Sequence, residues 1–207
     1  MHQKFRMTPA VLYLAVNVLD RFMAAAKEPP SSNTIVACAC LLIAAKIEEI
    51  YPPKVRDIRK TIPSISATDL CKMERLILNT LKFTVSVPTV FHFMKRYLKA
   101  ADADQQLKAL TMYIVESSMY DSMYHRFKPS LLAASSLSLA RKMLGKTEWN
   151  STLQAETQYG TDALRDCING LNGLLGKVKS APVPHSVTTK FRAPKFLEVA
   201  KVSCVAV

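Results

Sequence analysis

Apolar residues recur every three or four positions in long segments that prolines separate, and this spacing is typical of amphipathic helices. Proline is tolerated in the first turn of a helix and excluded from its interior, so each proline-free segment is predicted to hold one helix or a helix pair. The pattern predicts helices over residues 10–26, from Asn33 or Thr34 to about residue 50, and over residues 66–81. No alternating segments joined by Asn-Gly or Asp-Gly indicate a hairpin. The sequence therefore predicts an all-α fold.

Short polar patterns mark further helix starts. Thr8 followed by Pro9 is typical of a cap and a first helical residue, and Asp102 and Ser151 each precede a glutamine three positions later. Side-chain oxygens at such positions accept hydrogen bonds from the first N–H groups of a helix. We therefore expect helices to begin after Thr8, Asp102 and Ser151.

The segment over residues 35–45 is apolar on all sides rather than along one face. A helix of this kind lies at the centre of a bundle. A similar segment follows 96 residues later, where Ser130 replaces Thr34 and Lys142 replaces Lys46. This repeat predicts two tandem helical bundles, each around a buried central helix, over residues 1–100 and 101–207. A chance alignment of apolar helices is the alternative explanation.

Composition narrows the possible functions. The chain has 207 residues, a formal net charge of +12 and 49% hydrophobic residues, as in a folded globular protein. Its five glycines form no phosphate-binding motif, and its histidines and cysteines match no metal-site spacing, so we expect no cofactor, no metal and no catalytic site. The longest apolar run is too short to span a bilayer. Five scattered cysteines without a C-x-x-C pattern favour a reduced intracellular protein.

Two charged residues interrupt apolar helix faces in the first half. Glu74 has Leu70 and Ile77 at helical spacing, and Lys46 extends the apolar central segment. A buried charge without a partner is costly, so we expect each to have one. The pair could be structural, or it could present hydrogen-bonding groups to another protein. Because Ile168 stands opposite Glu74 in the repeat, a purely architectural role is disfavoured.

Basic residues gather in two short clusters. Arg56, Arg59 and Lys60 form one, and Lys95, Arg96 and Lys99 form the other. A solvated surface is the simplest interpretation. An acidic or phosphorylated partner, or nucleic acid, is the alternative.

Ordered motifs along the chain resemble those of A- and B-type (mitotic) cyclins. Residues 13–22 (YLAVNVLDRF) resemble the second helix of a cyclin box, and residues 44–53 (AAKIEEIYPP) resemble the end of its third helix. Further matching segments are residues 72–78, 81–83, 87–89 and 92–97 in the first half, and residues 128–134, Trp149 and residues 195–196 in the second. The resemblance covers essentially the whole chain and implies two tandem cyclin-box folds.

The beginning of the chain departs from this resemblance. Residues 2–6 resemble only the tail of the first cyclin-box helix, and its M-R-x-x-L-x-x-W surface is missing. The resemblance therefore implies a first fold that is truncated at its N-terminus.

The resemblance implies a non-catalytic regulatory subunit that binds and activates a cyclin-dependent Ser/Thr protein kinase in cell-cycle control, around G2/M. It implies a heterodimer with that kinase, contacts with substrate or inhibitor proteins, no membrane partner, and a nuclear or cytoplasmic location. Carried over by position, the kinase-binding residues are Ile43, Lys46, Ile47, Glu74, Leu78, Phe83 and Val85.

Two other functions stay open. The cyclin fold also occurs in general transcription initiation factors, so a DNA- or protein-binding module is one alternative. Basic residues do not interleave with aromatic ones as a base-stacking surface requires, so we do not expect a nucleic-acid partner. A scaffold that binds a kinase without activating it is the other alternative.

Overall fold

The computed structural model describes residues 1–26, 32–121, 123–146, 149–181 and 185–204. Every regular element in these ranges is a helix, which confirms the predicted all-α class. The chain divides into two compact units, Met1–Phe91 and His92–Val207. The division drawn from the sequence after residue 100 follows helix α5 (Val90–Ala100), whereas the observed one lies close to the beginning of that helix.

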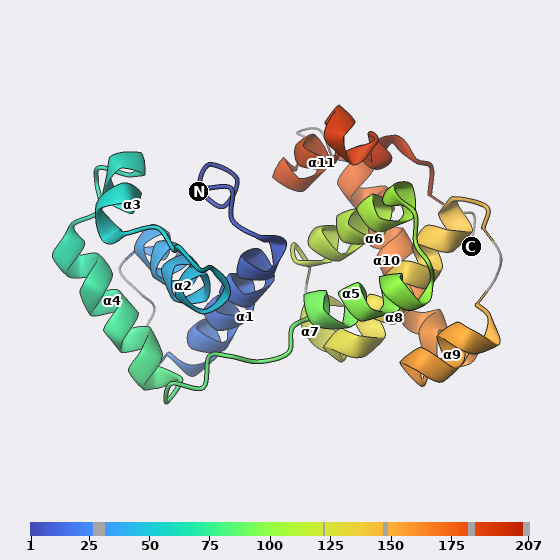
Figure 1. Ribbon diagram of the computed structural model, residues 1–207, viewed down its shortest axis with the longest axis horizontal. Coiled ribbons are helices and arrows are strands. Elements are labelled where there is room, and N and C mark those ends of the chain that lie inside the picture. Colours follow the sequence, from blue (N-terminus) through green and yellow to red (C-terminus); the bar gives the residue numbers. More distant parts are fainter. Residues whose placement is uncertain (27–31, 122, 147–148, 182–184, 205–207) are drawn as a thin grey trace. The chain divides into compact units, whose positions relative to one another are not determined.

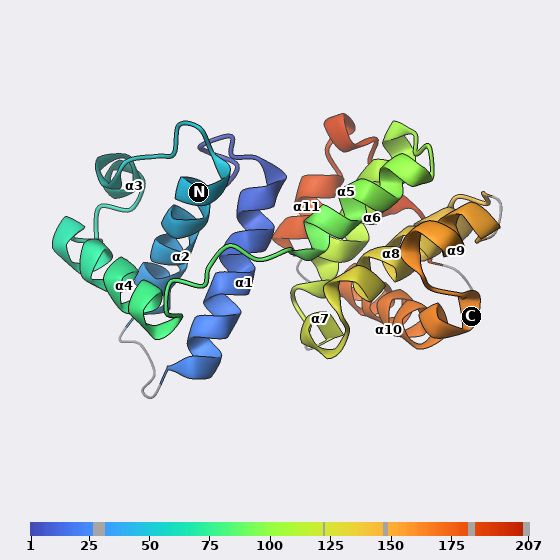
Figure 2. The same ribbon diagram turned by 60° about the horizontal axis from the view of Figure 1, so that its bottom comes forward.

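Within its described residues, 1–26 and 32–91, the first unit packs four helices around its own core. The helices are α1 (Pro9–Ala25), α2 (Asn33–Glu48), α3 (Val55–Thr61) and α4 (Ala67–Thr80), shown from blue to green in Figure 1. Helix α2 packs against both α1 and α4, and α3 packs against α4. Figure 2 shows the same arrangement from another side, with α2 between its two neighbours.

Helix α2 is central because nearly all of its residues can be buried. Val36 and all eight residues from Cys38 to Ala45 are buried, and Ala39, Ala44 and Ala45 have no exposed surface. Small side chains such as these let neighbouring helices approach closely, so α1 and α4 can enclose α2. The exception at the end of the helix is Lys46, which is exposed and therefore reaches the surface of the unit.

The second unit repeats this plan. Its α-helices after α5 are α6 (Gln105–Ser118), α7 (Met123–Arg126), α8 (Pro129–Met143), α9 (Ser151–Thr157), α10 (Thr161–Ser180) and α11 (Ser186–Phe191). Two short 3₁₀ helices follow, η1 (Pro194–Phe196) and η2 (Val199–Lys201). Helix α8 packs against α6 and α10, and its residues from Leu132 to Arg141 are buried. The prediction of two tandem bundles around buried central helices is therefore confirmed.

Two predicted helix caps were wrong by one or two residues. Asp104, rather than Asp102, caps α6, and its Oδ1 accepts the N–H of Leu107 at 2.8 Å. Asp102 has a φ of 43° and belongs to the turn after α5. Similarly, Asn150 caps α9 while Ser151 is its first helical residue. In both places two nearby polar side chains are able to cap the helix. The path of the preceding backbone determines where the helix begins and therefore which of them is the cap.

The residues before α1 form hydrogen-bonded turns where the resemblance indicated the tail of a helix. The N–H of Phe5 donates to the carbonyl of Met1 at 3.0 Å, and the N–H of Arg6 donates to that of Gln3 at 3.1 Å. The φ of Arg6 is 51°, a left-handed value that ends any helical path. The N–H of Thr8 donates to Glu49 Oε1 at 2.6 Å, so these turns lie beside the segment that follows α2.

Candidate protein-binding site

The two charges that interrupt apolar faces meet at the surface of the first unit. Lys46 lies in the last turn of α2 and Glu74 lies in the middle of α4, and Lys46 Nζ donates to Glu74 Oε1 at 2.5 Å. The Lys46 side chain is 50% exposed and the Glu74 side chain is 13% exposed. The packing of α2 against α4 brings together residues that are 28 positions apart in the sequence.

Local physics explains why each charge occupies its position. Lys46 lies at the C-terminal end of α2, where the helix dipole favours a cation by about 0.3–1 kcal/mol. Leu70 and Ile77 of α4 are fully buried, so Glu74 between them is carried to the edge of the packed face. A pair that is this exposed contributes about 0–1 kcal/mol to stability. Stability alone therefore gives little reason to keep it.

The pair has hydrogen-bonding capacity to spare. An ammonium group has three N–H donors and a carboxylate has about four acceptor positions. Within the described residues, the Lys46–Glu74 bond is the hydrogen bond that these two side chains make. Side by side, they can donate to a carbonyl and accept from an N–H of an extended chain on another protein.

Exposed apolar side chains border the end of α2. Ile47 is 39% exposed, and Ile50 and Tyr51 in the following loop are 88% and 92% exposed. Large apolar residues that are this exposed are uncommon on a surface with no binding role when they occur together. Ile50 and Tyr51 belong to the cyclin-like motif over residues 44–53 but were not among the predicted site residues. Large apolar residues directly after a buried helix could have indicated from the sequence that Ile50 and Tyr51 belong to the site.

Phe83 is held outward by a strained loop. Its side chain is 68% exposed, and Lys82 and Phe83 have φ values of 49° and 58°. A non-glycine residue in this left-handed region costs roughly 1–2 kcal/mol. Arg21 of α1 donates from Nη2 to the carbonyl of Thr84 at 2.7 Å and so fixes the loop. Arg21 was likewise not among the predicted site residues.

The other residues that the cyclin resemblance predicted for the site are less exposed than Lys46 and Phe83. Leu78 and Val85 are partly buried and pack against the core of the first unit. Ile43 is 3% exposed and belongs to that core. Its side chain offers almost no area to another protein, so we assign it to the support of Lys46 rather than to the contact surface. The contact surface of the candidate site is therefore Lys46, Glu74, Ile47, Phe83 and the half-buried Leu78 and Val85, together with Ile50 and Tyr51.

The second unit has no equivalent of this pair. Lys142 is exposed at the corresponding place on α8, but Ile168 of α10 is 7% exposed and packs in the core. The asymmetry seen in the sequence is thus present in the structure, and the charged surface pair is specific to the first unit.

The described residues contain no group of three or more His, Cys, Asp or Glu side chains that could hold a metal ion. Within the same residues, none of the helices combines the length and the apolar character that crossing a membrane requires.

Comparison with known proteins identifies the family. Residues 1–86 match the family model of the cyclin N-terminal domain, and residues 88–205 match that of the cyclin C-terminal domain. G2/mitotic-specific cyclin-A of Hydra viridissima is 37% identical over 94% of this chain, and G2/mitotic-specific cyclin-B of Dictyostelium discoideum is 32% identical over 99%. Each alignment covers 47% of the relative, so the chain spans about half the length of these curated relatives.

Solved structures agree on the fold. A viral cyclin from herpesvirus saimiri matches 85% of this chain and 80% of its own, with a TM-score of 0.73 and 18% identity. A chain of the yeast RNA polymerase II CTD kinase complex CTDK-1 matches all of this chain and 74% of its own, with a TM-score of 0.68 and 14% identity. With both domains matched in order over nearly the whole sequence, the chain belongs to the cyclin family, and its relatives include mitotic cyclins of the A and B types.

Proposed function

We propose that this chain is the non-catalytic regulatory subunit of a cyclin-dependent Ser/Thr protein kinase and acts in cell-cycle control around G2/M. Its curated relatives carry the names of G2/mitotic-specific cyclins, and one chain with a similar fold comes from a kinase complex. The observation that carries the proposal is the exposed Lys46–Glu74 pair with its border of apolar side chains.

This surface suits a kinase element that must be held in one position. Protein kinases are active only when a Lys–Glu ion pair forms inside the kinase and the activation loop is ordered. The Lys46–Glu74 pair can bind the main chain of such an element, while Ile47, Ile50 and Phe83 supply apolar area. Main-chain hydrogen bonds are independent of side-chain identity, so the pair fixes position and the apolar residues add affinity.

Activation then follows from preferential binding. A subunit that binds the active arrangement more tightly shifts the kinase towards it. A shift from 1:99 to 99:1 needs about 5.5 kcal/mol of differential affinity. An interface of the usual size, about 1,600 Å2, can supply that much, whereas a few exposed ion pairs cannot. The exposed apolar residues are therefore as important to the proposal as the charges.

The test is a double substitution with a matched control. Lys46→Ala with Glu74→Ala should weaken binding to a recombinant cyclin-dependent kinase by about 2–5 kcal/mol, because the interface would enclose the pair. The control is Asp162→Ala with Arg165→Ala, which removes another exposed pair, with its N···O distance of 2.6 Å, from the second unit. Binding is measured by calorimetry and activity by phosphate transfer to a peptide substrate.

The outcomes separate the alternatives. The free energy of unfolding should change by about 1 kcal/mol or less in both variants. If the unfolding transition of the first variant collapses, the pair is architectural and the proposal loses its main support. If the wild-type chain binds the kinase without raising phosphate transfer, the chain is a scaffold rather than an activator.

We also propose a reducing, nuclear or cytoplasmic environment. All five cysteines are free, and Cys38, Cys40 and Cys167 are buried as ordinary apolar residues. Burial raises the pKa of the Cys40 thiol to about 12, and the nearby Asp20 carboxylate acts in the same direction. Imaging of a fluorescent fusion in living cells would test the location.

A further inference from the structure

A cavity of about 310 Å3 lies in the first unit between the turns before α1 and the segment that follows α2. Its apolar wall comes from Phe5 and Met7 on one side and from Tyr51 and Pro53 on the other. Its charged lining comes from two lysines, Lys4 and Lys60, and from two acidic residues. All of its lining residues belong to the first compact unit, Met1–Phe91.

Both acidic residues of the lining already hold the backbone. Glu49 Oε1 accepts the N–H of Thr8 at 2.6 Å and so ties the beginning of α1 to the end of α2. Asp57 Oδ2 accepts the N–H of Lys54 at 3.1 Å and closes the first turn of α3. These hydrogen bonds hold both carboxylates in place but leave their negative charge. Lys4 and Lys60 balance that charge, and Arg56 and Arg59 on α3 add two further positive charges beside the cavity.

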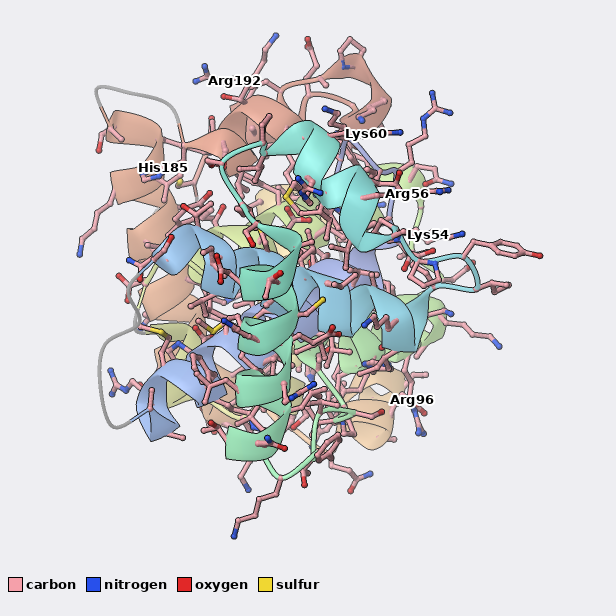
Figure 3. All side chains as sticks on the ribbon, turned by 90° about the vertical axis from the view of Figure 1, so that its left-hand side faces the viewer. Lys54, Arg56, Lys60, Arg96, His185 and Arg192 are labelled. Carbon is pink, nitrogen blue, oxygen red and sulfur yellow. The ribbon has the colours of Figure 1, made fainter. Side chains whose placement is uncertain are left out.

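The two lysines of the lining are available to a ligand. Lys4 and Lys60 are exposed, and no hydrogen bond or ion pair of their side chains occurs in the part of the chain that the structure describes. Arg59 is exposed in the same way, and Arg56 makes only a distant contact with Asp57 at 3.9 Å. Figure 3 shows Lys54, Arg56 and Lys60 on and just before α3, with their side chains projecting from it.

Cations gathered around a cavity favour an anionic ligand. Their mutual repulsion falls when a negative group is bound, and a lysine hydrogen bond to a carboxylate or a phosphate is stronger than one between neutral groups. The apolar wall adds room for a side chain beside the negative group. Nucleic acid fits less well, since base stacking needs a series of exposed aromatic faces along a groove and the cavity offers one exposed tyrosine.

We propose that this cavity binds an anionic segment of a partner protein, with a carboxylate or phosphate against Lys4 and Lys60 and an adjacent apolar side chain against Tyr51. Arg56 and Arg59 on α3 attract further negative charge along the same segment. The proposal goes beyond kinase regulation and does not depend on the Lys46–Glu74 pair, although the two surfaces meet at Tyr51. It adds a second protein-binding surface to the first unit.

The test measures the binding of defined peptides to the full 207-residue chain by fluorescence anisotropy. The probe is a fluorescein-labelled hexapeptide, Leu-pSer-Asp-Glu-Leu-Ala, and versions with serine or glutamate in place of phosphoserine separate phosphate from carboxylate recognition. The test variant is Lys4→Glu with Lys60→Glu. The control is Lys72→Glu with Lys177→Glu, which reverses two exposed lysines elsewhere and changes the net charge equally.

The test variant should bind the phosphopeptide at least about tenfold more weakly, and the control should lose less than about twofold. Amide shifts of the wild-type chain on titration should change at Phe5, Tyr51 and Lys60. Equal losses in both variants, shifts confined to other residues, or no binding of any peptide would overturn the proposal. So would tighter binding of an oligonucleotide of equal charge. If the charge reversals unfold the chain, Lys4→Met with Lys60→Met gives the same comparison. Because no kinase is present, failure here leaves the regulatory-subunit proposal standing.

Discussion

Among the residues that the structure describes, a lysine–glutamate pair joins two helices in each unit, and the two pairs differ in exposure. In the first unit, Lys46 and Glu74 are 50% and 13% exposed. In the second unit, Glu116 of α6 and Lys190 of α11 are 2% and 12% exposed. Lys190 Nζ donates to both Glu116 oxygens, at 2.6 and 2.8 Å. The same two types of side chain therefore pair once with a half-exposed lysine and once with both partners mostly buried.

The two pairs also differ in how many of their hydrogen-bonding groups have partners within the protein. Lys190 Nζ also lies 4.9 Å from the centre of the Phe191 ring and 5.7 Å from that of Phe196, so protein surrounds it. A buried pair of this kind holds α6 and α11 in one arrangement. The Lys46–Glu74 pair has unused donors and acceptors and is open to another molecule. Exposure and spare hydrogen-bonding capacity thus distinguish a recognition pair from a structural one.

The largest expected effect is on the buried pair. Glu116→Ala leaves Lys190 as a mostly buried cation without its partner, and we expect a loss of about 3–5 kcal/mol in the free energy of unfolding. Urea denaturation followed by circular dichroism measures it. Asp162→Ala, in the exposed pair with Arg165, is the control and should cost less than about 1 kcal/mol. Similar losses in the two variants would remove the distinction between buried and exposed pairs.

A smaller effect is expected when both charges of the buried pair are replaced together. Glu116→Leu with Lys190→Met removes the cost of burying two ions and keeps most of the volume. Buried pairs replaced in this way are often neutral or about 1–4 kcal/mol more stable. We therefore expect the double variant to unfold at a higher urea concentration than Glu116→Ala. If it is as unstable as the single variant, the pair does more than fill the interface between α6 and α11.

The smallest effect is on the pH dependence of stability. Burial raises the pKa of Glu116, and the nearby Lys190 charge only partly opposes this. The folded state therefore binds this proton more tightly than the unfolded chain does, and the Glu116 contribution to stability falls as pH rises from the ordinary carboxyl value of 4.5 through the raised one.

The measurement is the difference in unfolding free energy between the wild type and Glu116→Gln from pH 4 to pH 8. This difference isolates Glu116 from other carboxyls, including Asp104. A hydrogen bond from Lys146 lowers the pKa of Asp104, so its contribution is lost as pH falls. A difference that rises with pH would show that Lys190, rather than burial, dominates the titration of Glu116.

Local patterns predicted more of the fold than of the site. The all-round apolar character of residues 35–45 was enough to place α2 at the centre, because burial on all sides leaves no other position. The caps of α6 and α9 were misplaced by two residues and by one, because in each place two nearby polar side chains are both of a type that caps helices. Which of them caps depends on the backbone that arrives from the preceding segment, and the sequence rule does not contain that information.

The partners of the charged residues were also hard to predict, because they lie far away in the sequence. Glu74 stood out because it interrupts the apolar face of a strongly amphipathic helix. Glu116 interrupts an apolar segment in the same way, next to Ile114 and Val115, but its partner is 74 residues away on a short helix. Phe83 could be placed by resemblance, whereas its left-handed backbone and the hydrogen bond from Arg21 depend on contacts between distant segments.

Burial in the two cores also decides which sulfur atoms can react. Burial raises the pKa of Cys38 and of Cys167, as it does that of Cys40, so at neutral pH these three stay protonated and shielded. Cys71 is exposed on α4, one turn before Glu74 on the same helix face. With the partly exposed Cys204 changed to serine, a maleimide dye should attach at Cys71 alone. Its emission would then signal the arrival of a binding partner in real time.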